Sequence, residues 1–517
     1  MSAIITDQFR ILSAQNFIDS VESSSNSYYA FVGLTNSTDY DSDWENLPIS
    51  PLDSFDNYSD IWDTIIGLKK INADDIMMVA RKNTWESGII YDMYRHDVSR
   101  NKLSKPSNKT SLYRSNYYVI NGDYQVYICL NNGQDPENPN GRPSLDEPKF
   151  VDLEPRSAGI SGDGYIWKYL YTVKPREIIK FDSLQYIPVP KNWQTNQEVS
   201  SIRENANSEN SGQLKVILIT DRGSGLGSPG LKSNIPIVGD GTGGECSIVI
   251  GNDSNVESVN VTNGGSGYTY AYVDLESGGI SGDSLPKFEV IIPPPGGHGK
   301  NIYSELGCKN VLIYSRIEND NLNPDFITGN KIARIGVIKN PLNPIKDNNI
   351  DPSLLNVDKA SNTYALKLSG DYKSAIFEPN SIITQNIGVG NTAVGRVISY
   401  NNVTGVLKYW QDRTMVGFGT GSSELIKIPE YGYNLVGFST SGGNIIGENY
   451  NLPIDTSFSG FTMPINSKTY NLGQIFTNGI SNPEVQRYSG DMIYIDNRPS
   501  IVRSINQKED IKVILEF

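Results

Sequence analysis

The chain has very few histidines and cysteines. Its 517 residues include two histidines, His96 and His298, and three cysteines, Cys129, Cys246 and Cys308. A serine or cysteine nucleophile of the triad type needs a histidine as its base, and neither histidine stands in such a motif. The cysteines lie far apart and match neither a disulfide framework nor a zinc pattern, which is typical of a reducing cytosol. We therefore expect no catalytic residue, no metal and no cofactor.

Long apolar runs and long basic runs are also missing. No apolar run approaches the roughly 20 residues that span a bilayer, and the opening MSAIITDQFR lacks the basic start and apolar core of a signal peptide. The formal net charge is −14, whereas binding to nucleic acid draws its affinity from lysines and arginines that neutralise phosphates. The sequence therefore predicts neither nucleic-acid binding nor membrane insertion.

Tyrosine and glycine are abundant instead. There are 30 tyrosines against 15 phenylalanines, and 48 glycines. Tyrosine suits wet protein–protein contacts because it joins an apolar ring to a polar tip, and it is also common in β-rich proteins; both interpretations stay open. The length favours two to four domains.

Helices are expected near the N-terminus. Over 5–23, Phe9, Leu12, Phe17 and Val21 fall roughly on one helical face, which predicts an amphipathic helix that buries them. A strand is expected at 28–34, and 61–68 is predicted as a short buried helix, with Ser59 or Asp60 as its cap.

Strands are expected along the rest of the chain. Asn121-Gly122 within 117–130 predicts a hairpin, as does 388–411 with a turn at 401–405. The last seven residues, 511–517, form an apolar run without a polar tail, which predicts a terminal strand tied into a sheet.

A glycine-rich stretch at 213–295 has a repetitive texture. ITDRGSG at 219–225 recurs as VTNGGSG at 261–267, which indicates a small all-β module built from two copies of one unit. GDGTGG at 239–244 is interpreted as a turn, since no Lys-Ser/Thr follows it as in a phosphate-binding loop. The predicted fold class is α+β and β-rich, with a β-sandwich-like core, N-terminal helices and inserted all-β modules.

The C-terminal run RYSGDMIYIDNRP closely resembles the end of the gene-product-eight family of baseplate wedge subunits of contractile-tailed (myovirus) bacteriophages. That family has Arg-x-Ser-Gly-acid-Met-Ile-Tyr, then acid-Asn-Arg-Pro and a final strand ending in Phe. The matching residues are Arg487, Ser489, Gly490, Asp491, Met492, Ile493, Tyr494, Asp496, Asn497, Arg498, Pro499 and Phe517.

Other segments resemble the same family in the same order. They are Phe9-Arg10 and Asn16-Phe17, Trp62, Asp163-Gly164-Tyr165 with Trp167, Tyr169 and Leu170, Tyr186–Pro190 with Trp193, and Gly329-Asn330-Lys331 with Ile338, Asn340, Pro341 and Leu342. The resemblance assigns 1–204, 300–350 and 482–517 to the family core. It leaves 205–299 and 351–481 as a glycine-rich β-repeat module and a β-rich module inserted into that core.

The resemblance implies a non-enzymatic virion protein of the tail baseplate, assembled in the host cytoplasm. Family members form dimers and link the wedge scaffold to neighbouring wedge and tail-pin proteins, through baseplate assembly and host-triggered rearrangement. We expect the same partners and a homodimer here.

The C-terminal motif is the candidate structural site. Gly490 and Pro499 are expected to set turns. An aspartate–arginine ion pair is expected within the motif, drawn from Asp491, Asp496, Arg487 and Arg498. The motif is either an interface or the hydrogen-bonded core of the last sheet, and the second interpretation is favoured.

Two other functions compete with the structural one. A host-glycan-binding tail protein would use the glycine-rich module as its sugar site, and exposed aromatic residues on that module would favour it. A tail-associated glycosidase would need a cleft with two carboxylates about 5 to 9 Å apart.

Overall fold

The computed structural model describes residues 6–35, 44, 48–206, 212–318, 331–344, 353–388, 391–411, 427–428, 432–433, 437–502 and 508–517. Their fold is β-rich, with few helices and several separate sheets, so the predicted fold class is confirmed. Among these residues, no helix is long and apolar enough to cross a bilayer.

The chain forms two compact units. The first contains 1–18, 77–312 and 514–517, and the second contains 19–76 and 313–513. The chain therefore passes between the units at four places, and each unit holds one of the two segments predicted as insertions.

The first unit holds the longest helix and two small sheets besides its module. Its helices are α1 (Asp7–Glu22, which continues into the second unit), η4 (Leu112–Arg114), α3 (Pro175–Phe181), η5 (Gln197–Val199), α4 (Ser200–Asn205) and α5 (Ile302–Leu306). One sheet has the order β4-β5-β6, from Tyr118–Ile120, Gln125–Asn132 and Tyr165–Thr172. The other has the order β29-β14-β3-β7, from Lys508–Glu516, Asn310–Glu318, Ile76–Arg81 and Tyr186–Pro188, and its strands β29, β14 and β3 extend into the second unit.

The buried face of α1 differs from the predicted one. Its buried side chains are Ile11, Ala14, Ile18 and Val21. Phe9 and Leu12 are 59% and 52% exposed, so their predicted burial is wrong. The helix carries apolar residues on more than one side, so periodicity alone did not single out the packed face.

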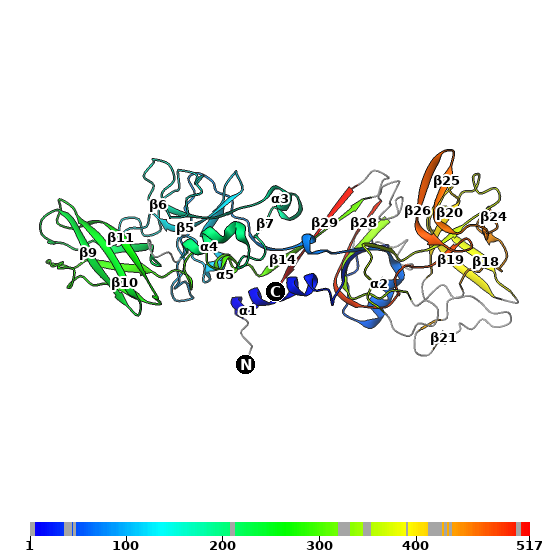
Figure 1. The fold of residues 1–517 in the computed structure, drawn as a ribbon, viewed down its shortest axis with the longest axis horizontal. Coiled ribbons are helices and arrows are strands. Elements are labelled where there is room, and N and C mark those ends of the chain that lie inside the picture. Colours follow the sequence, from blue (N-terminus) through cyan, green and yellow to red (C-terminus); the bar gives the residue numbers. More distant parts are fainter. Residues whose placement is uncertain are drawn as a thin grey trace. The chain divides into compact units, whose positions relative to one another are not determined.

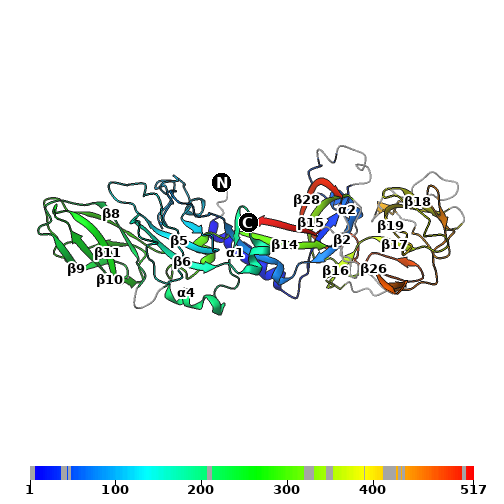
Figure 2. The same ribbon diagram turned by 90° about the horizontal axis from the view of Figure 1, so that it is seen from above.

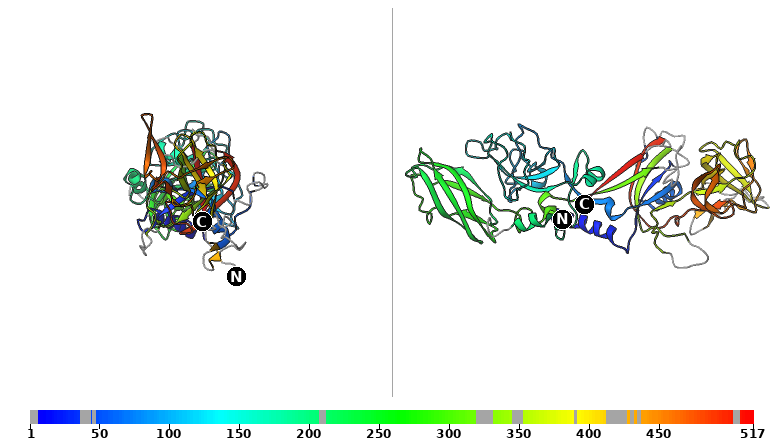
Figure 3. Two further views of the ribbon diagram at one scale, coloured as in Figure 1. Left: turned by 90° about the vertical axis from the view of Figure 1, so that its right-hand side faces the viewer. Right: turned by 45° about the horizontal axis from the view of Figure 1, so that its top comes forward.

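The first module, residues 214–292, has its own core. Its strands are β8 (Val216–Asp221), β9 (Gly230–Gly239), β10 (Thr242–Ile250), β11 (Val256–Ser266), β12 (Ala271–Val273) and β13 (Lys287–Ile291). They form sheets of order β11-β10-β9-β12 and β13-β8, drawn in green in Figures 1 and 3. Its core cluster consists of Leu214, Ile217, Leu226, Ile235, Ile237, Cys246, Ile248, Ile250, Val256, Tyr268, Ile280, Val290 and Ile292.

The sequence repeat in this module is not a structural repeat. The copy at 219–225 ends β8, which pairs with β13, whereas most of the copy at 261–267 lies in β11, which pairs with β10. The prediction of two copies of one unit is therefore wrong, because the two similar segments belong to strands of different sheets. The turn predicted at 239–244 is confirmed only at Asp240-Gly241, which join β9 to β10, because 242–244 already belong to β10.

A five-stranded sheet is central to the second unit. Its order is β16-β2-β1-β15-β28 (Figure 2), from Lys359–Ser361, Ile65–Lys70, Tyr28–Gly33, Lys331–Lys339 and Asp491–Val502. The helix predicted at 61–68 is confirmed for 61–64 and wrong for 65–68. Helix α2 spans Phe55–Thr64 and is capped by Ser54, and the chain then becomes strand β2. The pair Ile65-Ile66 is β-branched and buried, which suits a strand paired to β1. The short η3 helix (Ala73–Asp75) follows β2.

The second module, residues 364–481, is built around a seven-stranded sheet of order β24-β23-β18-β19-β20-β17-β27. In that order its strands are Asn451–Leu452, Ile445–Ile446, Ile382–Asn386, Thr392–Asn401, Val406–Trp410, Tyr364–Lys367 and Ile480–Ser481. Two ribbons accompany it, β21-β22 (Lys427–Ile428, Gly432–Tyr433) and β25-β26 (Gly460–Ile465, Lys468–Phe476). The hairpin predicted at 388–411 is confirmed as β19 and β20, and the hairpin at 117–130 as β4 and β5.

Candidate functional sites

The C-terminal motif begins with a buried ion pair. Arg487 lies just before β28, its side chain is 10% exposed, and its Nη2 lies 2.9 Å from Oδ1 of Asp63 on α2. The hydroxyl of Tyr488 donates to the same carboxylate, and Nη1 of Arg487 donates to the carbonyl of Gln411 at 3.0 Å. The pairing predicted for Arg487 inside the motif is therefore wrong, because the aspartate it meets lies on a helix distant in sequence.

Gly490 makes the turn that was predicted for it. Its φ is +78°, and a Cβ there would stand 2.6 Å from the carbonyl oxygen of Lys339, so only glycine fits without strain. The Oγ of Ser489 accepts from the amide of Leu342 at 3.0 Å and donates to the carbonyl of Gln486 at 2.6 Å. This turn starts β28 in register with β15.

The rest of the motif is the edge strand β28. Asp491, Tyr494, Asp496 and Asn497 stand opposite residues of β15. Arg498 pairs with Asp496 at 3.4 Å, which is the predicted kind of contact within the motif.

Pro499 lies within β28 rather than at a turn, so that expectation is wrong. It falls between Asn497 and Ile501, where the pairing of β28 with β15 shifts register, and an irregularity of this kind in an edge strand tolerates a residue without an N–H.

Asn497 ties β28 to a buried arginine. Its Oδ1 accepts from Nε of Arg334 at 2.7 Å, and Nη1 of Arg334 donates to Oγ1 of Thr64 at 2.7 Å. Arg334 is fully buried, and a buried guanidinium needs such partners. The motif therefore holds helix α2, strands β15 and β28 and the turn at Gly490 together within the second unit.

The C-terminal strand also fastens the chain end in the first unit. The amide of Phe517 donates to the carbonyl of Lys309 at 3.2 Å, and the Phe517 carbonyl accepts from Arg10 at 3.3 Å. The ring of Phe517 lies 5.5 Å from that of Phe17, centroid to centroid.

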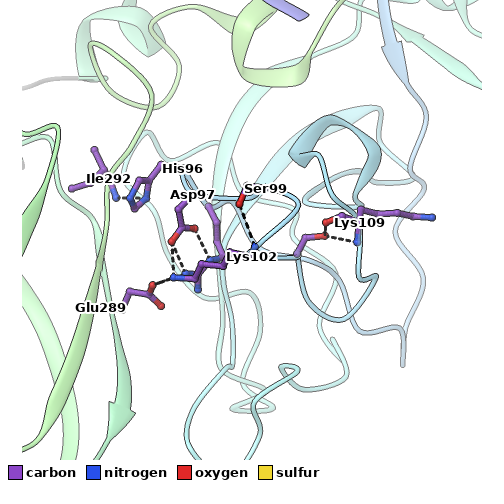
Figure 4. Close-up of polar contacts among 9 residues, drawn as sticks. His96, Asp97, Ser99, Lys102, Lys109, Glu289 and Ile292 are labelled. Atoms are coloured by element: carbon purple, nitrogen blue, oxygen red, sulfur yellow. Dashed lines mark hydrogen bonds and ion pairs between the residues drawn. The ribbon is translucent and has the colours of Figure 1, made fainter. Parts of the chain in front are cut away.

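A second cluster joins the first module to the rest of its unit, and no pattern in the sequence predicted it. Nη2 of Arg95 lies 2.7 Å from Oε1 of Glu289 on β13, and Nε of Arg95 lies 3.0 Å from Asp97. Lys102 pairs with Asp97 at 2.6 Å and also contacts Glu289. Figure 4 shows Glu289 pointing toward Lys102 and Asp97. Two cations and two carboxylates thus form one network, here called the module joint.

His96 belongs to the module joint as a hydrogen-bond acceptor. Its Nδ1 accepts from the amide of Ile292 at 3.2 Å (Figure 4). Burial lowers the pKa of His96, against the raising effect of Asp97, which keeps the ring neutral and able to accept at pH 7. Two further ion pairs support the joint, Arg222 with Glu137 at 2.8 Å and Lys215 with Glu154 at 3.0 Å.

His298 is a structural residue inside the first unit. It is buried, its Nδ1 lies 2.6 Å from Oε1 of Glu305, and the other carboxylate oxygen accepts from the amide of Gly299 at 2.6 Å. The ring of Tyr94 meets the imidazole edge to face, with centroids 4.6 Å apart. The carboxylate and imidazole thus close the glycine-rich loop before α5.

The three cysteines are buried free thiols. Burial raises the pKa of Cys246 to about 11, so its thiol stays protonated at neutral pH. In the part of the chain that the structure describes, no group of three histidine, cysteine or acidic side chains has the arrangement of a metal site.

Other residues of the resemblance hold loops in place. Asp163 accepts from the amides of Leu145 and Tyr165 at 2.9 and 3.0 Å, and Nε1 of the buried Trp193 donates to the carbonyl of Gly299 at 3.0 Å. Two more residues of it, Gly329 and Asn330, lie outside the described residues.

Comparison with known proteins adds no family. No family model matches the sequence, and a search of curated proteins gives no significant match.

Proposed function

We propose that this chain is a structural subunit of the baseplate wedge of a contractile phage tail. The observation that carries the proposal is the C-terminal motif, whose family-like residues Arg487, Ser489, Gly490 and Asn497 each make a specific fastening. Each of these contacts holds one part of the fold against another, which is a structural role. The other family-like segments follow in the same order along the chain.

The role we propose is mechanical. A wedge subunit transmits rearrangement by moving between packed arrangements as a stiff body. Buried ion pairs and tightly hydrogen-bonded turns at the end of the chain provide such stiffness, because local opening must break them together. We propose that the chain works as a homodimer beside other wedge and tail-pin proteins, without cofactor or catalytic activity.

Electron cryomicroscopy of intact tails tests the location. The proposal expects two copies in each baseplate wedge, related by a local two-fold axis and packed on the wedge scaffold. Density for the chain at a fibre tip, or its absence from the tail, would overturn the proposal.

The mass of the purified chain in solution tests the dimer separately. Light scattering after size-exclusion chromatography should give twice the 57.1 kDa of one chain. A monomer at all concentrations up to those of assembly would contradict the dimer, though not the location.

A further inference from the structure

Two tyrosines of the first module, separated by one residue, are exposed. Tyr270 is 59% exposed and Tyr272, on the edge strand β12, is 54% exposed. Between and after them, Ala271 and Val273 pack against the core of the module. Successive side chains of a strand point to opposite faces, so the Tyr272 ring lies on the face of β12 away from the core. Tyr270 lies in the bend just before β12, and its ring is exposed there. Neither ring belongs to the core cluster of the module, so the packing of the module does not explain their presence.

The backbone that carries these rings is held firmly. The side chain of Gln213 accepts from the amide of Tyr268 and donates to its carbonyl, both at 2.8 Å. The buried Tyr268 ring donates its hydroxyl to the carbonyl of Ile237 and accepts from the amide of Gly244, both at 2.9 Å. The segment is therefore anchored immediately before the exposed pair.

Asp240 provides a second anchor. Its carboxylate accepts from the amide of Thr269 at 2.8 Å and from that of Tyr270 at 3.2 Å. The hydrogen bonds from Thr269, with that from Tyr270, lower the pKa of Asp240 to about 2, so the carboxylate is ionised at neutral pH. A rigid aromatic pair binds with less entropic cost than a mobile one.

The stretch of chain around the two tyrosines contains no cationic residue. From residue 233 to residue 286 there is no lysine, arginine or histidine. The carboxylates in that stretch are Asp240, Glu245, Asp253, Glu257, Asp274, Glu276 and Asp283. A stretch of chain with carboxylates and no cations repels ligands of the same sign, so phosphorylated or other acidic ligands are disfavoured.

The remaining outer face of the sheet is polar. Tyr272 stands opposite Val238 on β9, and two residues away on the same strand Pro236 stands opposite Glu245. Glu245 in turn stands opposite Asn263 on β11, and both are exposed. Residues opposite one another share a face, so a carboxylate and an amide lie on the face that carries Tyr272.

We propose that Tyr270 and Tyr272 form a binding platform for an uncharged saccharide. The apolar face of a tyrosine ring covers the C–H face of a sugar, while its hydroxyl remains available for hydrogen bonds. The carboxylate of Glu245 and the amide of Asn263 supply acceptors and a donor for sugar hydroxyls. The cation-free surroundings select against acidic polysaccharides. The platform does not depend on the wedge role.

The test uses the full chain and three uncharged probes: maltohexaose, cellohexaose and chitohexaose. Saturation-transfer NMR should show binding of at least one of them, with a Kd in the range of about 0.1 to 5 mM. Dextran sulfate, the acidic probe, should not compete. No saturation transfer to any of the three at a concentration of about 10 mM would overturn the proposal, as would stronger binding of dextran sulfate.

Variants locate the platform. Tyr270→Ala with Tyr272→Ala should weaken binding at least tenfold, whereas Tyr270→Phe with Tyr272→Phe should retain the stacking and most of the affinity. Phe461→Ala is the matched control, since this aromatic ring is 40% exposed on the other module. An unchanged melting temperature excludes unfolding as the cause. Full affinity in the double alanine variant would overturn the assignment.

Discussion

The two modules are fastened to their units in different ways. The first module keeps its core cluster within 214–292 and meets its unit through ion pairs, both at the module joint and between Arg222 and Glu137. The second module shares apolar packing with the five-stranded sheet: Ile398 and Trp410 belong to one cluster with Val32 and Ile66. Its polar link, Arg487 with Asp63, is buried.

This difference predicts different responses to the same perturbation. Partly exposed ion pairs are weakened by salt and acid and each contributes little. Shared apolar burial and a buried pair are insensitive to salt and costly to break singly. We therefore expect the first module to loosen by itself, and the second to unfold together with its sheet.

Arg487→Met should have the largest effect. It leaves Asp63 buried without its cation, which costs about 3 to 5 kcal/mol of the free energy of unfolding. Chemical denaturation measures that loss. Arg498→Ala is the control, because its partner Asp496 is at the surface and the pair is 3.4 Å apart; its loss should be below about 1 kcal/mol. Equal losses in the two variants would contradict the expected difference between the buried and the exposed ion pair.

Gly490→Ala should come next. The left-handed backbone and the close Lys339 carbonyl make the substitution cost about 1 to 3 kcal/mol. Gly162→Ala is the matched control, since it also has a positive φ but meets nothing within 4 Å. A cost no larger than that of the control would show that the close approach to β15 is unimportant. Thermal melting of both variants makes the comparison.

Glu289→Gln should have a smaller and more local effect. It removes the carboxylate that Arg95 and Lys102 share, and we expect a loss of about 1 kcal/mol. Hydrogen exchange should rise along 214–292 and remain unchanged in 364–481. Equal increases in both modules would contradict separate fastening.

Acid should loosen the first module. The loss of stability from protonating each carboxyl group should be the smallest of these effects. Burial opposes ionisation of both Asp97 and Glu289, but bonds and ion pairs with Arg95 and Lys102 lower the pKa of each carboxyl overall. Their stabilisation is therefore complete above the ordinary pKa values of 3.8 and 4.5 and is lost as pH falls through the lower folded values. Exchange protection of 214–292 should fall below about pH 4.5. Protection that falls instead as pH rises from 5 to 8 would reverse the sign and contradict this account.

Local signals in the sequence predicted much of the secondary structure. The β-rich class, the hairpins at 117–130 and 388–411, and the turn at Gly490 follow from strand alternation and from the backbone freedom of glycine. Those preferences act over a few residues, so they are readable without the fold. The motif forms β28 at the edge of the five-stranded sheet, whereas the last strand, β29, belongs to another sheet; its role as an interface stays a prediction.

The tertiary structure alone decided which distant groups meet. Arg487 and Asp63 lie 424 residues apart in the chain, and Arg95 and Glu289 lie 194 apart. It also decided that Ile65-Ile66 extends as a strand beside β1 and that α1 buries Ile11 instead of Phe9. Charge pairing and face selection depend on which elements pack together, and the free energy of that packing comes from contacts that no local pattern records.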